Sequence, residues 1–174
     1  MFVYSQTPSP VANDQALTIN EGATSNGTLT GTDSDSSDSE LSFAVVGSPT
    51  SGTLTIESNG SFTYVHSGGE GTSDSFTFSI SDEDNNTSNT ATVTITVTPV
   101  NDVPVIANIS KTLDEGASAE INVSGSDAEG AILIYEIVTA PLYGTYTFDT
   151  SSGIGYYTHD GSETITDTIV VRAK

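Results

Sequence analysis

The sequence predicts an all-β chain that folds as two β-sandwiches in tandem. Three observations lead to this prediction. Apolar and polar residues alternate over short runs, no stretch keeps a helical period, and the whole pattern recurs with an offset of 104 − 10 = 94 residues between Pro10 and Pro104. Together they favour short strands that each bury one face.

The strands are expected where the alternation is clearest. In "ATVTITVTPV", residues 91–100, apolar side chains occupy one face and threonines the other, and threonine suits the solvated side of a pleated sheet. Similar runs cover residues 41–47, 52–57, 60–66 and 74–82. The side chains predicted to face the core are Leu41, Phe43, Val45, Leu54, Ile56, Phe62, Tyr64, Phe76, Phe78, Ile80, Ala91, Val93, Ile95 and Val97. Clusters such as "SPTSG" and "EDNNTSN" mark the turns between them.

The chain repeats itself once. The offset of 94 residues also carries Glu21-Gly22 onto Glu115-Gly116, and "PTSGTLTI" at 49–56 returns as "PLYGTYTF" at 141–148. A unit of slightly under ~100 residues fits an immunoglobulin-like sandwich of seven strands. We therefore expect two immunoglobulin-like sandwiches.

The domain boundary is predicted in "TPVNDVPV", residues 98–105. Residues 8–100 form repeat 1, residues 101–174 form repeat 2, and residues 1–7 are interpreted as the remnant of a preceding repeat. Lys174 corresponds to Ser81, so repeat 2 is expected to lack its last strand, the counterpart of 90–98. The edge left open is a site for association, and residues 2–6 of another copy of the chain are a candidate to fill it.

The charge of the chain excludes several classes of function. Twenty-three Asp and Glu face three Lys and Arg, which gives a net charge of −20. Such a field repels nucleic acid and anionic membranes, and divalent cations relieve the self-repulsion of the fold. The sequence has no cysteine, so it has no disulfide and no thiol chemistry. "MFVYSQTPSP" is not expected to be a signal peptide, and no apolar run is long enough for a membrane span.

The acidic stretch "GTDSDSSDSE", residues 31–40, is predicted to be a loop between two strands. An EF-hand requires Gly at position 6 and Glu at position 12 of the loop. Counted from Asp33, these positions hold Asp38 and Ala44, so an EF-hand is excluded. Flanking strands argue against a disordered linker, and repeat 2 has the counterpart "GSDAEGA" at 125–131.

Strand direction predicts that carboxylates from distant positions meet where the two repeats join. If seven strands alternate in direction, the first-to-second and fifth-to-sixth loops of repeat 1 lie beside the exit segment, and the second-to-third loop of repeat 2 follows it. The residues so placed are Glu21, Glu70, Asp74, Asn101, Asp102, Asp127 and Glu129. Hard oxygen ligands in this number suit Ca²⁺. Solvated acidic turns are the alternative, since Asp favours turns by itself.

The motifs "NEG", "SDSFTFSISD" and "TVTITVTPVNDVPV" resemble bacterial cadherin-like and VCBS-type repeats of large secreted adhesins, over nearly all of repeat 1 and most of repeat 2. The resemblance implies calcium at the junction, held by the residues named above. It also implies a second site that uses Asp33, Asp35 and Asp82. The linker departs from the family pattern D-x-N-D-N-x-P, because Pro99 and Val103 replace an aspartate and an asparagine. The family pattern also has an aspartate after the sixth strand, which Asp82 matches in repeat 1 but which would fall at position 175 in repeat 2. The junction is therefore expected to be one ligand short and to bind weakly.

No residue is predicted to be catalytic. His66 and His159 occupy equivalent strand ends, where a local hydrogen bond or packing role is favoured over zinc binding or base catalysis. Four tyrosines of repeat 2 are expected to pack on the strands rather than stack on sugars: Tyr143, Tyr146, Tyr156 and Tyr157.

The sequence therefore predicts a calcium-binding structural and adhesive module of a secreted bacterial cell-surface protein, and not an enzyme. The alternative is a carbohydrate-binding module attached to a secreted polysaccharide hydrolase. The expected partners are calcium, a cell-surface or matrix polysaccharide, and another copy of the chain.

Overall fold

The computed structural model describes residues 8–37, 40–163 and 166–174. The chain divides into two compact units, Met1–Val100 and Asn101–Lys174, which are described one at a time. The prediction for residues 1–7, and their proposed role in pairing with another copy, lies outside the described residues.

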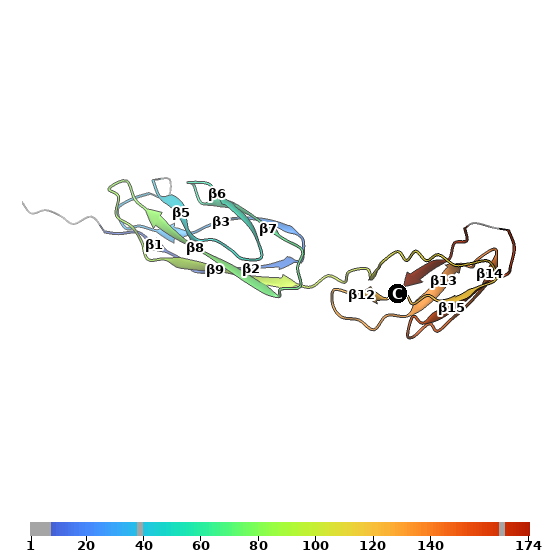
Figure 1. Cartoon of the computed structure of the whole chain (residues 1–174). Coiled ribbons are helices and arrows are strands. Elements are labelled where there is room, and N and C mark those ends of the chain that lie inside the picture. The colour runs from blue at the N-terminus through green and yellow to red at the C-terminus, as the bar shows by residue number, and fades with distance from the viewer. Residues whose placement is uncertain (1–7, 38–39, 164–165) are drawn as a thin grey trace, which may run out of the picture. The chain divides into compact units, whose positions relative to one another are not determined.

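The larger sheet of unit 1 has four strands, in the order β2-β9-β8-β5. Their bounds are β2 Gln15–Asn20, β5 Ser42–Gly47, β8 Ser73–Ser81 and β9 Ala91–Thr98. β9 runs antiparallel to β8 and parallel to β2, with Gln15 opposite Val93 and Asn20 opposite Thr98. β9 is thus an inner strand, flanked on both sides (Figure 1).

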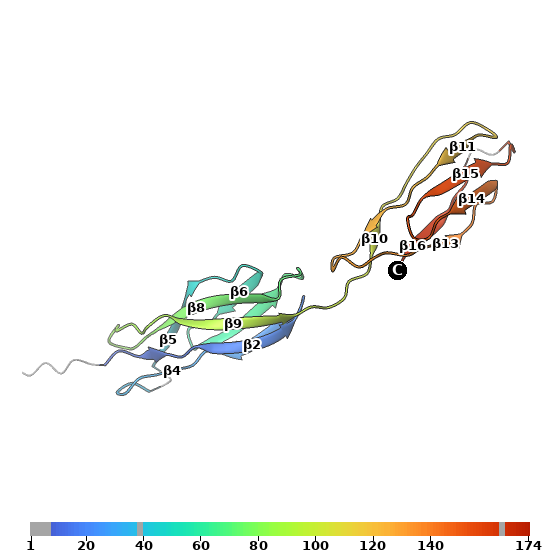
Figure 2. The ribbon, with the colours of Figure 1, turned by 90° about the horizontal axis from the view of Figure 1, so that it is seen from below.

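The second sheet of unit 1 has the order β3-β7-β6, with bounds β3 Thr24–Thr28, β6 Gly52–Ile56 and β7 Ser61–His66. Two short strands, β1 Val11–Ala12 and β4 Gly31–Thr32, form a separate antiparallel pair. Figures 1 and 2 show the two larger sheets facing each other in layers. Unit 1 is therefore a β-sandwich.

The core of unit 1 follows from the alternation of residues along its strands. All four apolar side chains of β9 are at most 3 % exposed, while its threonines lie on the outer face. From the other sheet, the ring of Phe62 meets the ring of Phe76 edge to face, with centroids 5.5 Å apart, a favourable aromatic geometry. The buried apolar cluster consists of Ala12, Ile19, Leu29, Leu41, Phe62, Tyr64, Phe76, Phe78, Ile80, Ala91, Val93, Ile95 and Val97.

Unit 2 repeats this plan with shorter strands. Its sheets are β10-β12, β11-β15-β14 and β13-β16. The bounds are β10 Val105–Ile106, β11 Ser118–Glu120, β12 Gly125–Ser126, β13 Tyr135–Thr139, β14 Gly144–Phe148, β15 Gly155–His159 and β16 Val170–Ala173. Among the described apolar residues of unit 2, only Val123, Tyr135 and Tyr157 are buried. Its core is correspondingly small.

The predicted fold class is confirmed: the described residues form strands and no helix, in two tandem sandwiches, and the second has no counterpart of β9. One detail of the core prediction is wrong. Val45 was expected to face the core with Leu41 and Phe43, yet it is 43 % exposed. The register between β5 and β8 shifts between Val45 and Gly47, and this irregularity ends the regular alternation of β5.

Candidate functional site

Two tight turns meet at the end of unit 1 where β9 finishes. One is the Glu21-Gly22 turn after β2, and the other is the 67–72 loop between β7 and β8. Gly22 and Gly68 have φ angles of 66° and 80°, a region that glycine adopts without the strain a Cβ imposes. A Cβ added to Gly22 would lie 4.0 Å from the Cα of Gly68, so the two turns are in contact.

His66 holds the two turns together. It is the last residue of β7 and only 3 % exposed. Its Nδ1 accepts hydrogen bonds from the N–H groups of Gly22 and Gly68, each at 3.2 Å. In unit 2, Nδ1 of His159 accepts from Gly116 at 3.3 Å and from Gly161 at 3.1 Å. The predicted local hydrogen-bonding role of both histidines is confirmed.

The clamped turns bring two carboxylates together. Oxygens of Glu21 and Glu70 lie within 4.8 Å of one another, with Glu21 half-buried and Glu70 exposed. Glu21 is fixed from both sides: its N–H donates to the Thr98 carbonyl at 2.9 Å, and its Oε2 accepts from the Val100 N–H at 3.3 Å. These contacts place Glu21 where the chain leaves β9.

The next acidic residue along the chain is Asp102. It follows Val100 by two residues, so the chain alone keeps their Cα atoms within about 7 Å. Inside unit 2, the N–H of Asp102 donates to Oε1 of Glu129 at 2.8 Å, and Nδ2 of Asn101 donates to the Asp102 carbonyl at 2.7 Å. Asp127 closes the turn that carries Glu129, because its Oδ1 accepts from the Ala131 N–H at 3.0 Å. The predicted Asn101, Asp102, Asp127 and Glu129 therefore belong to one local arrangement.

Asp74 has a different, structural role. It is 9 % exposed, and its carboxylate accepts hydrogen bonds from the backbone N–H groups of Thr50, Ser51 and Ser75. The hydroxyl groups of Tyr64, at 2.8 Å, and Thr50, at 3.2 Å, also donate to it. Burial by itself raises the pKa of Asp74, but these hydrogen bonds outweigh burial and hold the pKa below its usual range. Because its oxygens are committed to these donors, we leave Asp74 out of the candidate metal site.

The same arrangement of a tyrosine and an aspartate recurs in unit 2, and this recurrence is visible in the sequence. Oδ2 of Asp167 accepts from the Tyr157 hydroxyl at 2.9 Å, and its two oxygens accept from the Leu142 and Tyr143 N–H groups at 2.9 Å. A tyrosine followed ten residues later by aspartate occurs in both repeats, as Tyr64/Asp74 and Tyr157/Asp167. That recurrence in the sequence indicates a structural pair.

The opposite end of unit 1 gathers the second set of predicted ligands. Oδ1 of Asp33 accepts from the Asp35 N–H at 3.1 Å, which is the largest cause of a lowered pKa for Asp33. The pKa of Asp35 is raised, first by its side-chain hydrogen bond with Asp33, then by burial and by the charges of Asp33 and Asp82. Asp82 is 7 % exposed and accepts from the Asn86 N–H at 2.7 Å and from Asn86 Nδ2 at 2.8 Å. The three predicted residues thus share one electrostatic environment.

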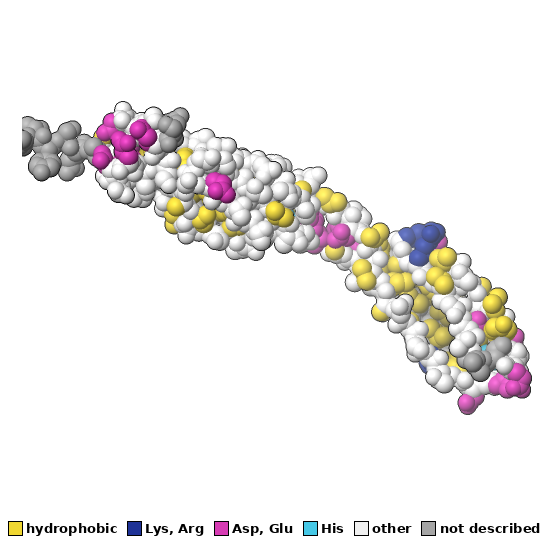
Figure 3. Space-filling view, turned by 90° about the horizontal axis from the view of Figure 1, so that it is seen from above, with side chains coloured by type: hydrophobic (Ala, Val, Ile, Leu, Met, Phe, Trp, Pro, Cys, Tyr) yellow, Lys and Arg dark blue, Asp and Glu magenta, His cyan; other side chains and the backbone are white. Residues whose placement is uncertain are grey.

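One carboxylate oxygen at this end of unit 1, Oδ2 of Asp33, is buried without a hydrogen-bond partner among the described residues. Three further carboxylates that the sequence prediction missed, those of Glu40, Glu83 and Asp84, lie close by, since the charges of Glu40, Asp84 and Asp82 all raise the pKa of Glu83. Figure 3 shows Asp and Glu side chains gathered at this end of unit 1. An unpaired buried carboxylate oxygen amid other anions fits a hard cation.

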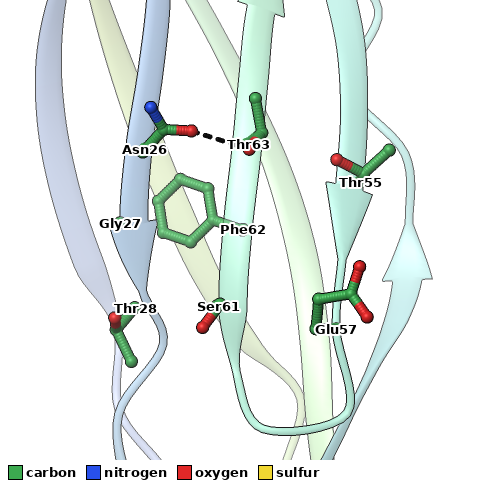
Figure 4. Close-up of a pocket in the computed structure, with 8 residues that line it drawn as sticks. All are labelled: Asn26, Gly27, Thr28, Thr55, Glu57, Ser61, Phe62 and Thr63. Carbon is green, nitrogen blue, oxygen red and sulfur yellow. Dashed lines mark hydrogen bonds between the residues drawn. The ribbon is translucent and has the colours of Figure 1, made fainter.

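A shallow pocket of about 430 Å³ lies on the β3-β7-β6 sheet of unit 1 (Figure 4). Its lining is polar: Oγ1 of Thr63 donates to Oδ1 of Asn26 at 2.7 Å, and Glu57 supplies its carboxylate. Phe62 is its one aromatic residue and is only 7 % exposed, so the pocket offers no open ring for a sugar to stack on. Within the described part of the chain, no helix is long and apolar enough to cross a membrane.

Two family models match the chain. Residues 8–99 match the bacterial cadherin-like domain, and residues 101–174 match the bacterial Ig domain. None of the curated proteins matches the chain at a significant level.

Several solved structures with a similar fold are cadherin ectodomains. Drosophila N-cadherin EC1-4 matches with a TM-score of 0.58 and 18 % identity, covering 94 % of this chain and 44 % of that one. Human protocadherin-24 EC1-2 matches with a TM-score of 0.57 and 15 % identity over 95 % of this chain and 93 % of that one. Protocadherin gamma B7 EC1-4 matches with a TM-score of 0.51 and 13 % identity, covering 95 % and 49 %. This chain thus spans less than half of two of these structures, and the likeness shows the fold alone.

Proposed function

Because the chain belongs to the bacterial cadherin-like domain family, we propose that it is a structural and adhesive repeat module of a secreted bacterial surface protein, in which Ca²⁺ stiffens the segment joining the two repeats. Bacterial cadherin-like and bacterial Ig domains are typically extracellular and non-catalytic. The observation that carries the calcium proposal is the clamped pair of Glu21 and Glu70, with oxygens within 4.8 Å where β9 ends.

The ligand set is of the kind that Ca²⁺ takes, since this ion binds six to eight oxygens from carboxylates, carbonyls and water. Glu21 and Glu70 supply carboxylates from unit 1, and Asn101 and Asp102 follow directly in the chain. Glu129 and Asp127 supply oxygens from unit 2. A bound ion would neutralise carboxylates that otherwise repel, in a chain whose net charge is −20.

Stiffening follows from where these groups sit in the chain. Glu21 and Glu70 are anchored in unit 1 by His66, and Asp102 is anchored in unit 2 by Glu129. An ion that takes ligands from both sets would fix the dihedral angles of the intervening residues. The second set, Asp33, Asp35 and Asp82, would hold a second ion at the opposite end of unit 1 in the same way.

Calcium binding is tested by calorimetric titration of the chelator-treated chain. We expect saturable binding with a Kd of about 10⁻⁴ to 10⁻³ M, as in other extracellular calcium modules. The double variant Glu21→Gln, Glu70→Gln is expected to weaken the junction site at least roughly tenfold, because it removes two charged ligands. Glu57→Gln is the matched control, since Glu57 is exposed and lies in the polar pocket instead.

Stiffening is tested by small-angle scattering of the same proteins. A maximum dimension and a melting temperature that stay the same between chelator and millimolar Ca²⁺ would contradict the proposal. Adhesive ligands are sought by polysaccharide pulldown with and without Ca²⁺. Sugar-specific retention that depends on the exposed Tyr156 and not on Ca²⁺ would favour a carbohydrate-binding module instead.

A further inference from the structure

The histidine clamps of the two units differ in the residue that follows the histidine. The segment is "HSG" at 66–68 in unit 1 and "HDG" at 159–161 in unit 2, and in each unit the histidine accepts from the glycine N–H. Oδ1 of Asp160 lies 4.0 Å from Nδ1 of His159. The hydroxyl group of Ser67 instead donates to a backbone carbonyl of another loop at 2.9 Å. The clamp of unit 2 therefore has an anionic neighbour at a position where unit 1 has a serine.

The clamp of unit 2 requires a neutral imidazole. Nδ1 of His159 accepts from the N–H groups of Gly116 and Gly161, so the proton of the neutral ring is on Nε2. Protonation adds a second proton at Nδ1, which then points at two N–H donors and can accept from neither. The two hydrogen bonds and the protonated ring therefore exclude each other.

Asp160 is the group best placed to accept the Nδ1 proton of a protonated His159. Besides Asp160, the titratable side chains on the segments around His159 are Lys111, Asp114, Glu115, Tyr157, Glu163 and Asp167. Asp167 and Tyr157 are hydrogen-bonded to each other, Lys111 donates to a backbone carbonyl of β11, and the other three side chains are exposed. Hydrogen bonds from the Ser162 side chain and N–H, together with the charge of His159, hold the pKa of Asp160 below its usual range. Asp160 therefore stays ionised at every pH at which histidine titrates.

We propose that His159 and Asp160 form a pH-sensitive latch on two turns of unit 2. The neutral imidazole accepts from Gly116 and Gly161 and holds the turn before β11 against the loop after β15. As the pH falls through the range in which histidine takes up its second proton, about pH 8 to 5, Nδ1–H donates to Asp160 and releases both N–H groups. Unit 1 keeps its clamp closed over this range because Ser67 offers no anion to a protonated ring. The latch contains none of the candidate calcium ligands and acts independently of the proposed function.

The latch is tested on the full chain in the presence of chelator, by NMR at several pH values from about 8 to 5. The nitrogen shifts of the His159 ring report its protonation, and hydrogen-exchange protection factors, corrected for the intrinsic pH dependence of exchange, report the two glycines. We expect protection at Gly116 and Gly161 to fall about fivefold, with the same midpoint as protonation of the ring. Gly22 and Gly68 are expected to keep their protection. Protonation of His159 without a loss of protection, or an equal loss at Gly22 and Gly68, would overturn the proposal.

Three variants locate the effect in Asp160 and His159. Asp160→Ser gives unit 2 the residue that unit 1 has, and we expect Gly116 and Gly161 to stay protected at about pH 5. Asp149→Ser is the matched control, because Asp149 is an exposed acid in the turn at the other end of β15, and acid should still open the latch. His159→Asn retains an oxygen acceptor close to the position of Nδ1 that does not titrate, so protection should hold at both ends of the pH range. An acid-induced loss that persists in Asp160→Ser or His159→Asn, or that disappears in Asp149→Ser, would contradict the latch.

Discussion

Asp74 and Asp167 occupy equivalent positions in the two units, and each accepts hydrogen bonds from backbone N–H groups of a distant turn. Each accepts from three backbone N–H groups and one tyrosine hydroxyl. Asp74 thereby links the start of β8 to the turn before β6, and Asp167, three residues before β16, contacts the turn before β14. The tyrosines respond in turn: burial and the hydrogen bond to Asp167 raise the pKa of Tyr157 to about 12. These acidic residues stabilise the fold and do not add to its repulsive surface.

Asp74→Asn is expected to lower the free energy of unfolding of unit 1 by about 2–4 kcal/mol at pH 7, because an amide nitrogen would face N–H donors. The folded-state pKa of Asp74 is depressed. Its contribution is therefore present above the unfolded pKa of about 3.9 and is lost as the pH falls through the folded pKa. Urea unfolding at pH 7 and at pH 3, followed through amide signals of β8, measures the difference, which should shrink at pH 3. An equal loss at both values would show that the ionised carboxylate is not what matters.

The tyrosines of unit 2 show that residue type alone does not determine which side chains are buried. Packing was predicted for all four tyrosines of repeat 2, and Tyr157 is 5 % exposed as expected. Tyr156, its neighbour on the other face of β15, is 53 % exposed and donates to Oε2 of Glu120 at 2.9 Å. Alternation along the strand requires this difference, so adjacent tyrosines in one strand cannot both be core residues.

At the scale of elements, His66 joins the β2–β3 turn to the β7–β8 loop. The side chain accepts both bonds through Nδ1, so an imidazole protonated at that atom cannot make them. Its Nε2 is buried and has no hydrogen-bond partner among the described residues. The histidine thus contributes a single acceptor atom whose function is to hold two turns in contact.

His66→Ala is expected to free both turns, because two N–H groups lose their acceptor at about 1 kcal/mol each. Hydrogen exchange at Gly22 and Gly68 should accelerate, and calcium affinity should fall because Glu21 and Glu70 lose their fixed spacing. His159→Ala is the matched control and should accelerate exchange at Gly116 and Gly161 only. Unchanged exchange at Gly22 and Gly68 in His66→Ala would show that the clamp is dispensable.

The strands and the sites were predictable to different degrees. Alternation in residues 91–98 predicted which side chains of β9 are buried, because side-chain direction in a strand is fixed by sequence parity. It failed at Val45, where a register shift depends on the neighbouring strand. Strand direction predicted that Glu21 and Glu70 lie close together. It could not predict that Asp74, which was placed in the same candidate metal site, instead has a structural role. Its donors come from residues 50 and 51, and no local pattern connects them to it.

At the scale of the whole molecule, the two units differ in how much apolar surface they bury. Among the described residues, unit 1 has a continuous buried cluster with members from both sheets, while unit 2 buries three apolar side chains. The internal repeat in the sequence predicts the same sandwich for both units, with the last strand absent from repeat 2. The difference arises because the counterpart of β9 is not in unit 2, and a strand that pairs on both sides contributes to the core along its entire length.

Thermal unfolding is therefore expected in two steps, with unit 2 first. Burial of a valine or isoleucine side chain is worth about 1.5–3 kcal/mol, and the described residues of unit 2 include no counterparts of Val93, Ile95 and Val97, so the stabilities of the two units differ widely. Differential scanning calorimetry of the whole chain should resolve two transitions, and amide signals of β13–β16 should vanish in the first. A single cooperative transition in the presence of chelator would contradict this prediction.

The parallel pairing of β2 with β9 determines how unit 1 responds to tension. The chain arrives at one end of β2 and departs from the opposite end of β9, with Gln15 beside Val93 and Asn20 beside Thr98. A force applied to the two ends of the unit therefore shears β2 against β9. The hydrogen bonds between the two strands then share the force and do not break one after another. That geometry resists extension of unit 1 until all the hydrogen bonds between the two strands break together.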